Sequence, residues 1–144
     1  MSGAISETYV PAIRHDLADL DGDERLVGVV REPTGWFRAA VDENRPELGP
    51  PSDLLDETRQ RAEDLQMQGL CEEGAHNAAW DETEFASRYL ASLDTDDEAQ
   101  RALDELEGRI HEGDAIVLVC FEGNRKRCHR TLLRDRLQDR LDGA

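Results

Sequence analysis

The sequence predicts a single α/β domain with a mainly parallel sheet flanked by helices. Two apolar runs rich in β-branched residues, "RLVGVV" and "AIVLVCF", are typical of buried strands. Amphipathic segments that match helices lie between and after these runs. The order of strand, helices, strand and helix favours parallel strands joined by crossovers. At 144 residues the chain suits one domain with one core, so we treat residues 1–144 as a unit.

The predicted strands are short. One covers residues 26–31 and is stopped by Pro33, and the other covers 115–121. The segment "AISETYV" near the amino terminus could add a third strand. We expect a loop or short helix over 11–25, and an irregular stretch with one helical turn over 33–51, which holds four of the five prolines.

Four helical segments are predicted from periodicity and capping residues. Ser52 is expected to cap the first, and Asp94 or Thr95 the third, which Gly113 ends. A break in the helical pattern is expected over 67–79. The predicted helices cover residues 52–66, 80–93, 94–112 and 128–141.

The composition is strongly acidic. Asp and Glu number 33 against 17 Lys and Arg, which gives a formal net charge of −16, and Lys126 is the one lysine. With 38% hydrophobic residues in periodic blocks, the chain reads as folded rather than disordered. Many acids with almost no lysine indicate a halophilic protein, because molar salt screens the repulsion between like charges.

The sequence shows no secretory signal peptide. Its first residues show neither a basic segment nor an apolar one, and no apolar run could span a bilayer, so we expect a cytoplasmic protein without a membrane partner. Three cysteines in a reducing compartment favour thiol chemistry, metal binding or burial over structural disulfides.

Positive charge gathers near the carboxyl terminus. Residues 121–140 hold seven cations and three acids, which leaves ten cations and thirty acids for the rest of the chain. The loop after a parallel strand, followed by a helix amino terminus, is a common site for anions. We therefore expect Arg125, Arg127 and Arg130 to hold a phosphate or carboxylate. Arg134, Arg136 and Arg140 lie further along, where pairing with neighbouring acids is the simpler expectation.

The cysteines admit three interpretations. Cys120 could be a nucleophile, since a cysteine beside cations or a helix amino terminus has a lowered pKa. Cysteine is also among the most buried residue types, so a structural role is open. The third alternative is a zinc site with Cys71, His76, Cys120 and Cys128 as ligands. The spacing of these residues along the chain is looser than in most zinc sites. Apart from that alternative, no cofactor is predicted.

The stretch "VLVCFEGNRKRCHRTLLRDRL" resembles the carboxyl-terminal signature of the domain-of-unknown-function 488 family. The matching residues are Cys120, Glu122, Cys128, His129 and Arg130. Upstream, "LVGVVREP" supplies Arg31, and "LGPPSDLL" and "WDETEFASRYL" resemble central stretches of the family, the latter with Tyr89. Relatives often carry an Asp two residues before that arginine, where this chain has Val29. The resemblance implies a small cytosolic α/β protein and the place of its site, but no reaction.

A shorter stretch, "VLVCFEGNR", is similar to the rhodanese active loop, with Cys120, Gly123 and Arg125 in the matching places. That similarity implies an alternative function in sulfur transfer or a phosphatase-like loop. Few residues follow the loop, and rhodaneses lack the added Cys-His-Arg, so convergence on an anion-binding loop is the preferred interpretation.

The sequence therefore predicts that the protein binds or processes a phosphate-bearing, nucleotide-like anionic small molecule. Cys120 and His129 are the expected catalytic residues, the latter as general acid and base. A nucleic-acid partner, docked on the helix face of Arg130, Arg134 and Arg140, is disfavoured by the net charge. The expected ligand-binding residues are Arg31, Tyr89, Glu122, Arg125, Arg127, Cys128 and Arg130.

Overall fold

The computed structural model describes residues 5–9, 23–120 and 128–143. Its sheet has four parallel strands in the order β1-β4-β2-β3, which confirms the predicted α/β class with a parallel sheet. The segment near the amino terminus does form a strand, paired with β4 from Ile5 to Tyr9. The strands are β1 (Ile5–Tyr9), β2 (Arg25–Gly28), β3 (Glu43–Asn44) and β4 (Ile116–Cys120).

Strand β4 lies between β1 and β2, and all five of its residues are buried. Its side chains alternate between the two faces of the sheet. Ile116 and Leu118 belong to the larger core, while Val117 and Val119 pack with Phe37 on the opposite face. The same alternation directs Cys120, at the end of the strand, toward the larger core.

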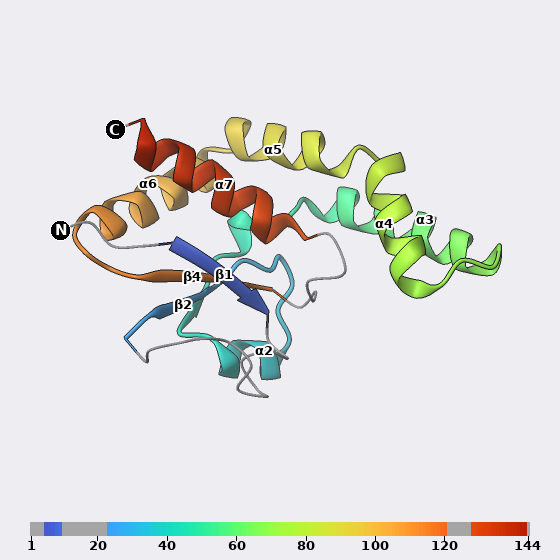
Figure 1. The fold of residues 1–144 in the computed structure, drawn as a ribbon, viewed down its shortest axis with the longest axis horizontal. Coiled ribbons are helices and arrows are strands. Elements are labelled where there is room, and N and C mark those ends of the chain that lie inside the picture. Colours follow the sequence, from blue (N-terminus) through green and yellow to red (C-terminus); the bar gives the residue numbers. More distant parts are fainter. Residues whose placement is uncertain (1–4, 10–22, 121–127, 144) are drawn as a thin grey trace.

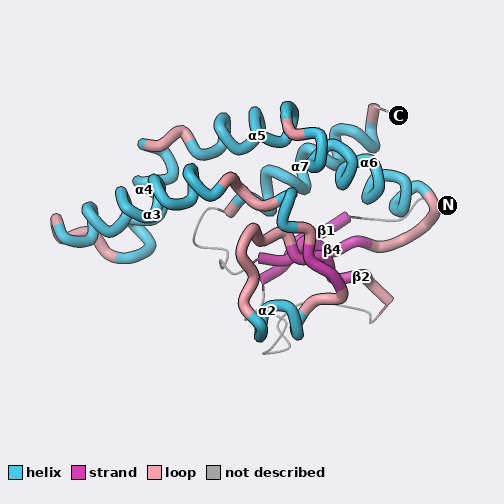
Figure 2. Tube along the Cα trace, turned by 180° about the vertical axis from the view of Figure 1, so that it is seen from behind, coloured by secondary structure: helices cyan, strands magenta, loops and turns pink. Residues whose placement is uncertain are grey.

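The helices cover the two faces unequally (Figures 1 and 2). Helices α5, α6 and α7 lie over one face and enclose the larger core, whereas α2 covers the other. Helices α3 and α4 pack against each other and project beyond the sheet. The helices are α2 (Gly35–Ala40), the short 3-10 helix η1 (Pro46–Leu48), α3 (Ser52–Met67), α4 (Glu72–Glu82), α5 (Phe85–Thr95), α6 (Asp97–His111) and α7 (His129–Asp142).

Several local predictions were wrong. The irregular stretch over 33–51 contains α2, η1 and the short strand β3. The expected break over 67–79 holds most of α4, whose first turn Cys71 caps by accepting a hydrogen bond from the Gly74 N–H. A sequence pattern could not show this, because α4 is packed mainly by alanines rather than by large apolar residues.

The predicted helix 80–93 is two helices. The chain turns at Glu84, which has φ 54° in the left-handed region, so α4 ends before it and α5 starts after it. The cap of α6 is Asp96, not Asp94 or Thr95, and its carboxylate accepts a hydrogen bond from the Glu98 N–H. In α3, Ser52 is the first helical residue rather than the cap. Gly113, with φ 110°, follows the end of α6 as predicted. Most of the segment 11–25 lies outside the described residues.

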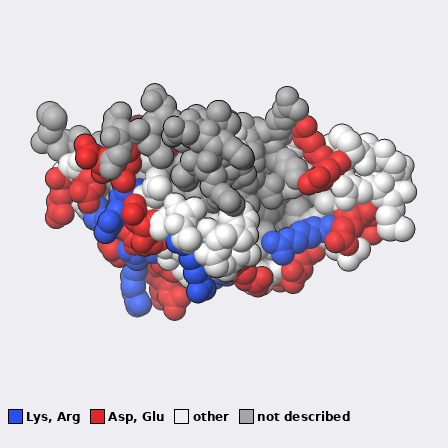
Figure 3. Space-filling model, turned by 90° about the horizontal axis from the view of Figure 1, so that it is seen from below, with Lys and Arg blue, Asp and Glu red and all other residues white. Residues whose placement is uncertain are grey.

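The arginines of α7 beyond its first turn pair with acidic side chains, as predicted for Arg134, Arg136 and Arg140. Arg136 contacts Asp94, and Arg140 contacts Asp104 and Glu107. Arginines and carboxylates are neighbours on the face shown in Figure 3. No helix in the described part of the chain is long and apolar enough to cross a membrane.

Candidate functional site

A cavity of about 330 Å³ lies beside the carboxyl end of β4. Cys120, Cys128 and His129 form one side of it. Helices α3 and α4 also line it, with Trp80 of α4, and so does Phe85 at the start of α5. The chain after β2 closes a third side with Val30, Arg31, Glu32 and Pro50. Ligands of parallel α/β sheets bind at this end of the strands.

The sulfur atoms of Cys120 and Cys128 lie 2.6 Å apart, and the two residues are not disulfide-bonded. Both are buried, and strand β4 and the start of α7 bring them together across the intervening loop. Burial is the main cause that raises the pKa of the Cys120 thiol well above its ordinary value, and the contact with Cys128 raises it further. This direction is opposite to the lowered pKa that is expected of a cysteine beside cations, although His129 and Arg130 act to lower the pKa of Cys120.

Arg130 is almost fully buried and donates from Nη1 to the Cys120 sulfur at 2.7 Å. It is not among the described residues that line the cavity. Burial tends to lower the pKa of Arg130, but the neighbouring thiols and Glu7 raise it above its ordinary value. A permanent cation at this place opposes the effect of burial and favours the Cys120 thiolate.

Glu7 of β1 holds Arg130 from the other side. Its carboxylate lies 3.4 Å from Arg130 Nε, accepts from the Thr131 hydroxyl at 2.7 Å and pairs with Arg134. The Arg130 guanidinium also lies over the Tyr9 ring, 5.5 Å from its centre. Strand β1 thus fixes the cation that reaches Cys120.

His129 is held by the chain that follows β2. Its Nε2 lies 2.6 Å from the carbonyl oxygen of Val29, and a carbonyl can only accept, so Nε2 carries the proton. In the neutral ring Nδ1 is then an acceptor, and it lies 3.6 Å from the Cys128 sulfur. This is the arrangement of a thiol beside a base that a third group orients.

Tyr89 and Arg31 support the site in different ways. Tyr89 is fully buried, donates to the Leu48 carbonyl and meets the His129 ring edge to face, with ring centres 5.4 Å apart. Burial raises the pKa of Tyr89 well above its ordinary value, so it stays a neutral phenol. Arg31 lines the cavity and donates to the carbonyl groups of Pro50 and Gly49.

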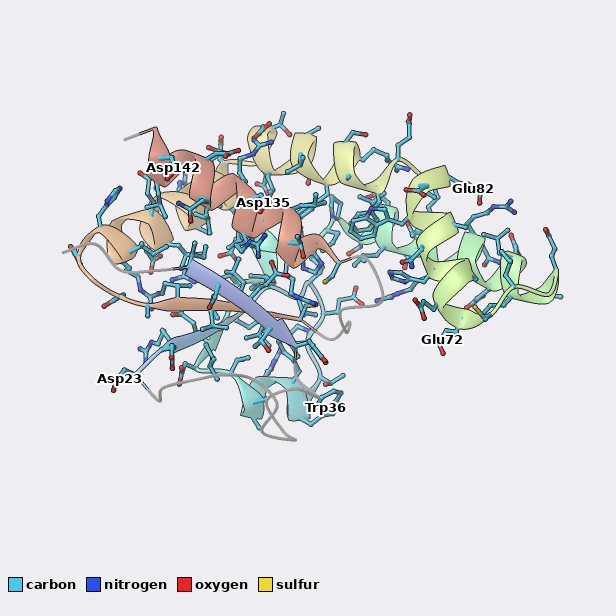
Figure 4. All side chains as sticks on the ribbon, in the orientation of Figure 1. Asp23, Trp36, Glu72, Glu82, Asp135 and Asp142 are labelled. Carbon is cyan, nitrogen blue, oxygen red and sulfur yellow. The ribbon has the colours of Figure 1, made fainter. Side chains whose placement is uncertain are left out.

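The wall formed by α3 and α4 supplies both charge and flat apolar surface. Arg59 is exposed on α3 and lines the cavity with Glu63. Trp80 and Phe85 are stacked with ring centres 3.9 Å apart. Figure 4 shows Glu72, another lining residue, at one end of α4 and Glu82 at the other.

The structure brings together Cys120, Cys128, His129 and Arg130, and Arg31 lines the same cavity as the first three. Three of the expected ligand-binding residues, Glu122, Arg125 and Arg127, lie outside the described residues, as does the rest of the rhodanese-like loop. Among the residues that the structure describes, no three His, Cys, Asp or Glu side chains form a group that could hold a metal ion. The alternative zinc set is not assembled, since Cys71 is exposed at the cap of α4.

Among the residues of this site that sequence reasoning missed are Glu7 and Arg59. Glu7 lies on a strand whose neighbours in the sheet were unknown, so its contact with Arg130 had no signal in the sequence. Arg59 looks like any solvent-facing arginine of an amphipathic helix, and only the tertiary structure shows that it lines a cavity.

One comparison with known proteins identifies the family of the chain. Residues 12–141 match the sequence model described as "Active DUF488-N3 subclade". The chain belongs to the DUF488-N3 family. This confirms the resemblance that rested on the residues around Cys120 and His129. Neither the curated proteins nor the solved structures gave a match.

Proposed function

We propose that this DUF488-N3 protein is a cysteine- and histidine-dependent hydrolase or transferase acting on a phosphate-bearing, nucleotide-like small molecule. One observation carries the proposal: the cavity at the end of β4 is lined on one side by Cys120, Cys128 and His129. Two thiols and an imidazole in direct contact beside a space of ligand size are the parts of a nucleophilic site.

The other walls suit a ligand that has both an anionic and a flat part. Arg31 uses Nε and Nη2 for backbone carbonyls, and its Nη1 has no partner among the described residues. With Arg59 it offers two cations for a phosphate. Glu63 and Glu72 can accept hydrogen bonds from ribose hydroxyls or base amino groups. Trp80 and Phe85 provide an apolar surface for a ring.

The contacts suggest how Cys120 is activated. His129 Nδ1 takes the proton of Cys128, and the Cys128 sulfur takes the proton of Cys120, which leaves a Cys120 thiolate beside Arg130. That thiolate attacks an electrophilic atom of the ligand, a bond to sulfur forms, and the bond to the leaving group breaks. The proton held by His129 passes through Cys128 to the leaving group. Water or an acceptor then attacks the atom bound to sulfur, gives its proton to His129 and releases Cys120 as a thiolate.

A nucleic-acid surface is less well supported. Beyond its first turn, α7 presents Arg134, Arg136 and Arg140, each of which pairs with at least one carboxylate. The net charge of −16 also opposes a polyanion. The same acidic composition leads us to propose that the protein works in molar salt, where close contacts within a cavity persist and long-range attraction does not.

Thermal unfolding in molar KCl tests the proposal, with inorganic phosphate, ribose 5-phosphate and the common nucleoside monophosphates as probes. We expect a nucleoside monophosphate to raise Tm more than phosphate alone. Arg59→Ala should weaken that probe about tenfold, the loss expected for one charge-assisted hydrogen bond.

Arg61→Ala is the matched control, because Arg61 lies on the same helix but pairs with Glu82 and does not line the cavity. The proposal fails if no probe shifts Tm. It also fails if the Arg59→Ala and Arg61→Ala variants bind the nucleoside monophosphate equally well.

A further inference from the structure

Cys120 and Cys128 are placed for chemistry with each other as well as with a ligand. Their sulfur atoms are 2.6 Å apart, against about 2.05 Å in a disulfide bond. Both line the cavity, so a small reagent that enters it can reach them. The third cysteine, Cys71, is exposed at the cap of α4 and pairs with neither.

We propose that Cys120 and Cys128 form a reversible two-electron redox pair, in which low-molecular-weight disulfides oxidise the dithiol to an intramolecular disulfide. This inference goes beyond the proposed function, because it needs no substrate. It assigns Cys128 as the resolving cysteine of the site.

The contacts provide for each step. The Cys120 thiolate, stabilised by Arg130, attacks a disulfide R–S–S–R, which forms a mixed disulfide on Cys120 and releases one thiolate RS⁻. The released RS⁻ takes the proton that His129 received when the Cys120 thiolate formed, so Nδ1 is again a base. Cys128 then gives its own proton to His129 Nδ1 and attacks the Cys120 sulfur. The disulfide bond between the Cys120 sulfur and the sulfur of the reagent breaks, and the second RS⁻ leaves. Two protein thiols are oxidised, the reagent is reduced to two thiols, and the two protons end on them.

The fold favours the internal disulfide over the mixed disulfide as the product of oxidation. Cys128 lies next to any adduct on Cys120, so the second attack occurs within the molecule and has a high effective concentration. Oxidation also removes the proposed nucleophile, so it would turn the proposed activity off until a thiol reduces the pair.

The test uses full-length Cys71→Ser protein, which retains only the two site thiols. The protein is equilibrated in glutathione buffers of graded ratio, quenched with acid and weighed by mass spectrometry. We expect the main oxidised species to lack two hydrogens and to carry no glutathione, in at least about tenfold excess over the mixed adduct. Peptide mapping should join the peptides of Cys120 and Cys128.

Adding Cys128→Ser should instead trap one glutathione on Cys120, and adding Cys120→Ser should prevent the internal bond. Circular dichroism checks that each variant folds, and the same buffers with guanidinium show what the unfolded chain does. The inference is overturned if both thiols stay reduced while Cys71 of the unmodified protein takes up glutathione, or if the folded protein collects two mixed adducts. It is also overturned if the unfolded chain closes the bond equally well. Ligand binding by the reduced protein is measured separately. If the internal disulfide does not form, the proposed function is unaffected. If no ligand binds, the redox proposal is unaffected.

Discussion

His129 Nε2 lies 2.6 Å from the carbonyl oxygen of Val29, and this one contact decides which nitrogen of the imidazole is a base. The backbone of Val29, not its side chain, orients the ring, and Nδ1 is turned to Cys128.

Replacing His129 by Gln should separate orientation from proton transfer. The amide nitrogen of Gln can still donate to the Val29 carbonyl, but the side chain has no base at the place of Nδ1. In a Cys71→Ser, Cys120→Ser background we expect the alkylation of Cys128 by iodoacetamide at neutral pH to slow at least about tenfold. His111→Gln is the control, since His111 is exposed and lies on α6. Equal rates in the two variants would show that Nδ1 does not act on Cys128.

Alkaline pH should weaken the fold. Burial raises the pKa of Cys120 and of Tyr89, so the unfolded chain releases these protons at lower pH than the folded one. The stabilisation is fully present below the ordinary cysteine pKa of about 8.5 and is lost as pH rises toward the folded values. We expect the free energy of unfolding, measured with urea under reducing conditions, to fall above about pH 8.5.

Tyr89→Phe should remove the part of this decline that begins near the ordinary tyrosine pKa of about 10, at a cost in stability at neutral pH because the Leu48 carbonyl loses its donor. A free energy of unfolding that is constant or rises over the alkaline range would contradict the prediction.

Gly49 allows two segments of backbone to meet beside the cavity. A Cβ atom added there would lie 2.5 Å from the backbone nitrogen of Arg31. We expect Gly49→Ala to lower the free energy of unfolding by about 1–3 kcal/mol, as overpacking against backbone usually does. It should also weaken any ligand held by Arg31. Gly35→Ala is the matched control, because nothing lies within 4 Å of a Cβ added there. The prediction fails if both variants have the stability of the unmodified protein.

Salt should stabilise the protein. With a net charge of −16, repulsion between acids opposes folding, and raising KCl from about 0.1 M to about 1 M shortens the screening length from about 10 Å to about 3 Å. We expect Tm to rise across this range. Sucrose at matched osmolality is the control for preferential exclusion. A fall in Tm would mean that the weakening of ion pairs such as Arg61–Glu82 outweighs the screening of repulsion.

The sequence by itself determined the fold class and the general place of the site. Strand β4 is a continuous apolar run because it is buried on both faces, and the cluster of Cys120, Cys128, His129 and Arg130 stood out in composition. Local features without such a signal were missed. Helix α4 packs through small alanines, β3 has only two residues, and the turn at Glu84 needs an unusual backbone conformation.

Only the tertiary structure decided what the site residues do. The sequence places Arg130 beside His129, but the contact of Glu7 with Arg130 joins two ends of the chain across the sheet. The same long-range packing brings Arg130 onto Cys120 and places Arg59 of α3 at the cavity. Neighbours along a chain follow from local propensity, whereas partners distant in sequence are fixed by which strands pair and which faces are buried.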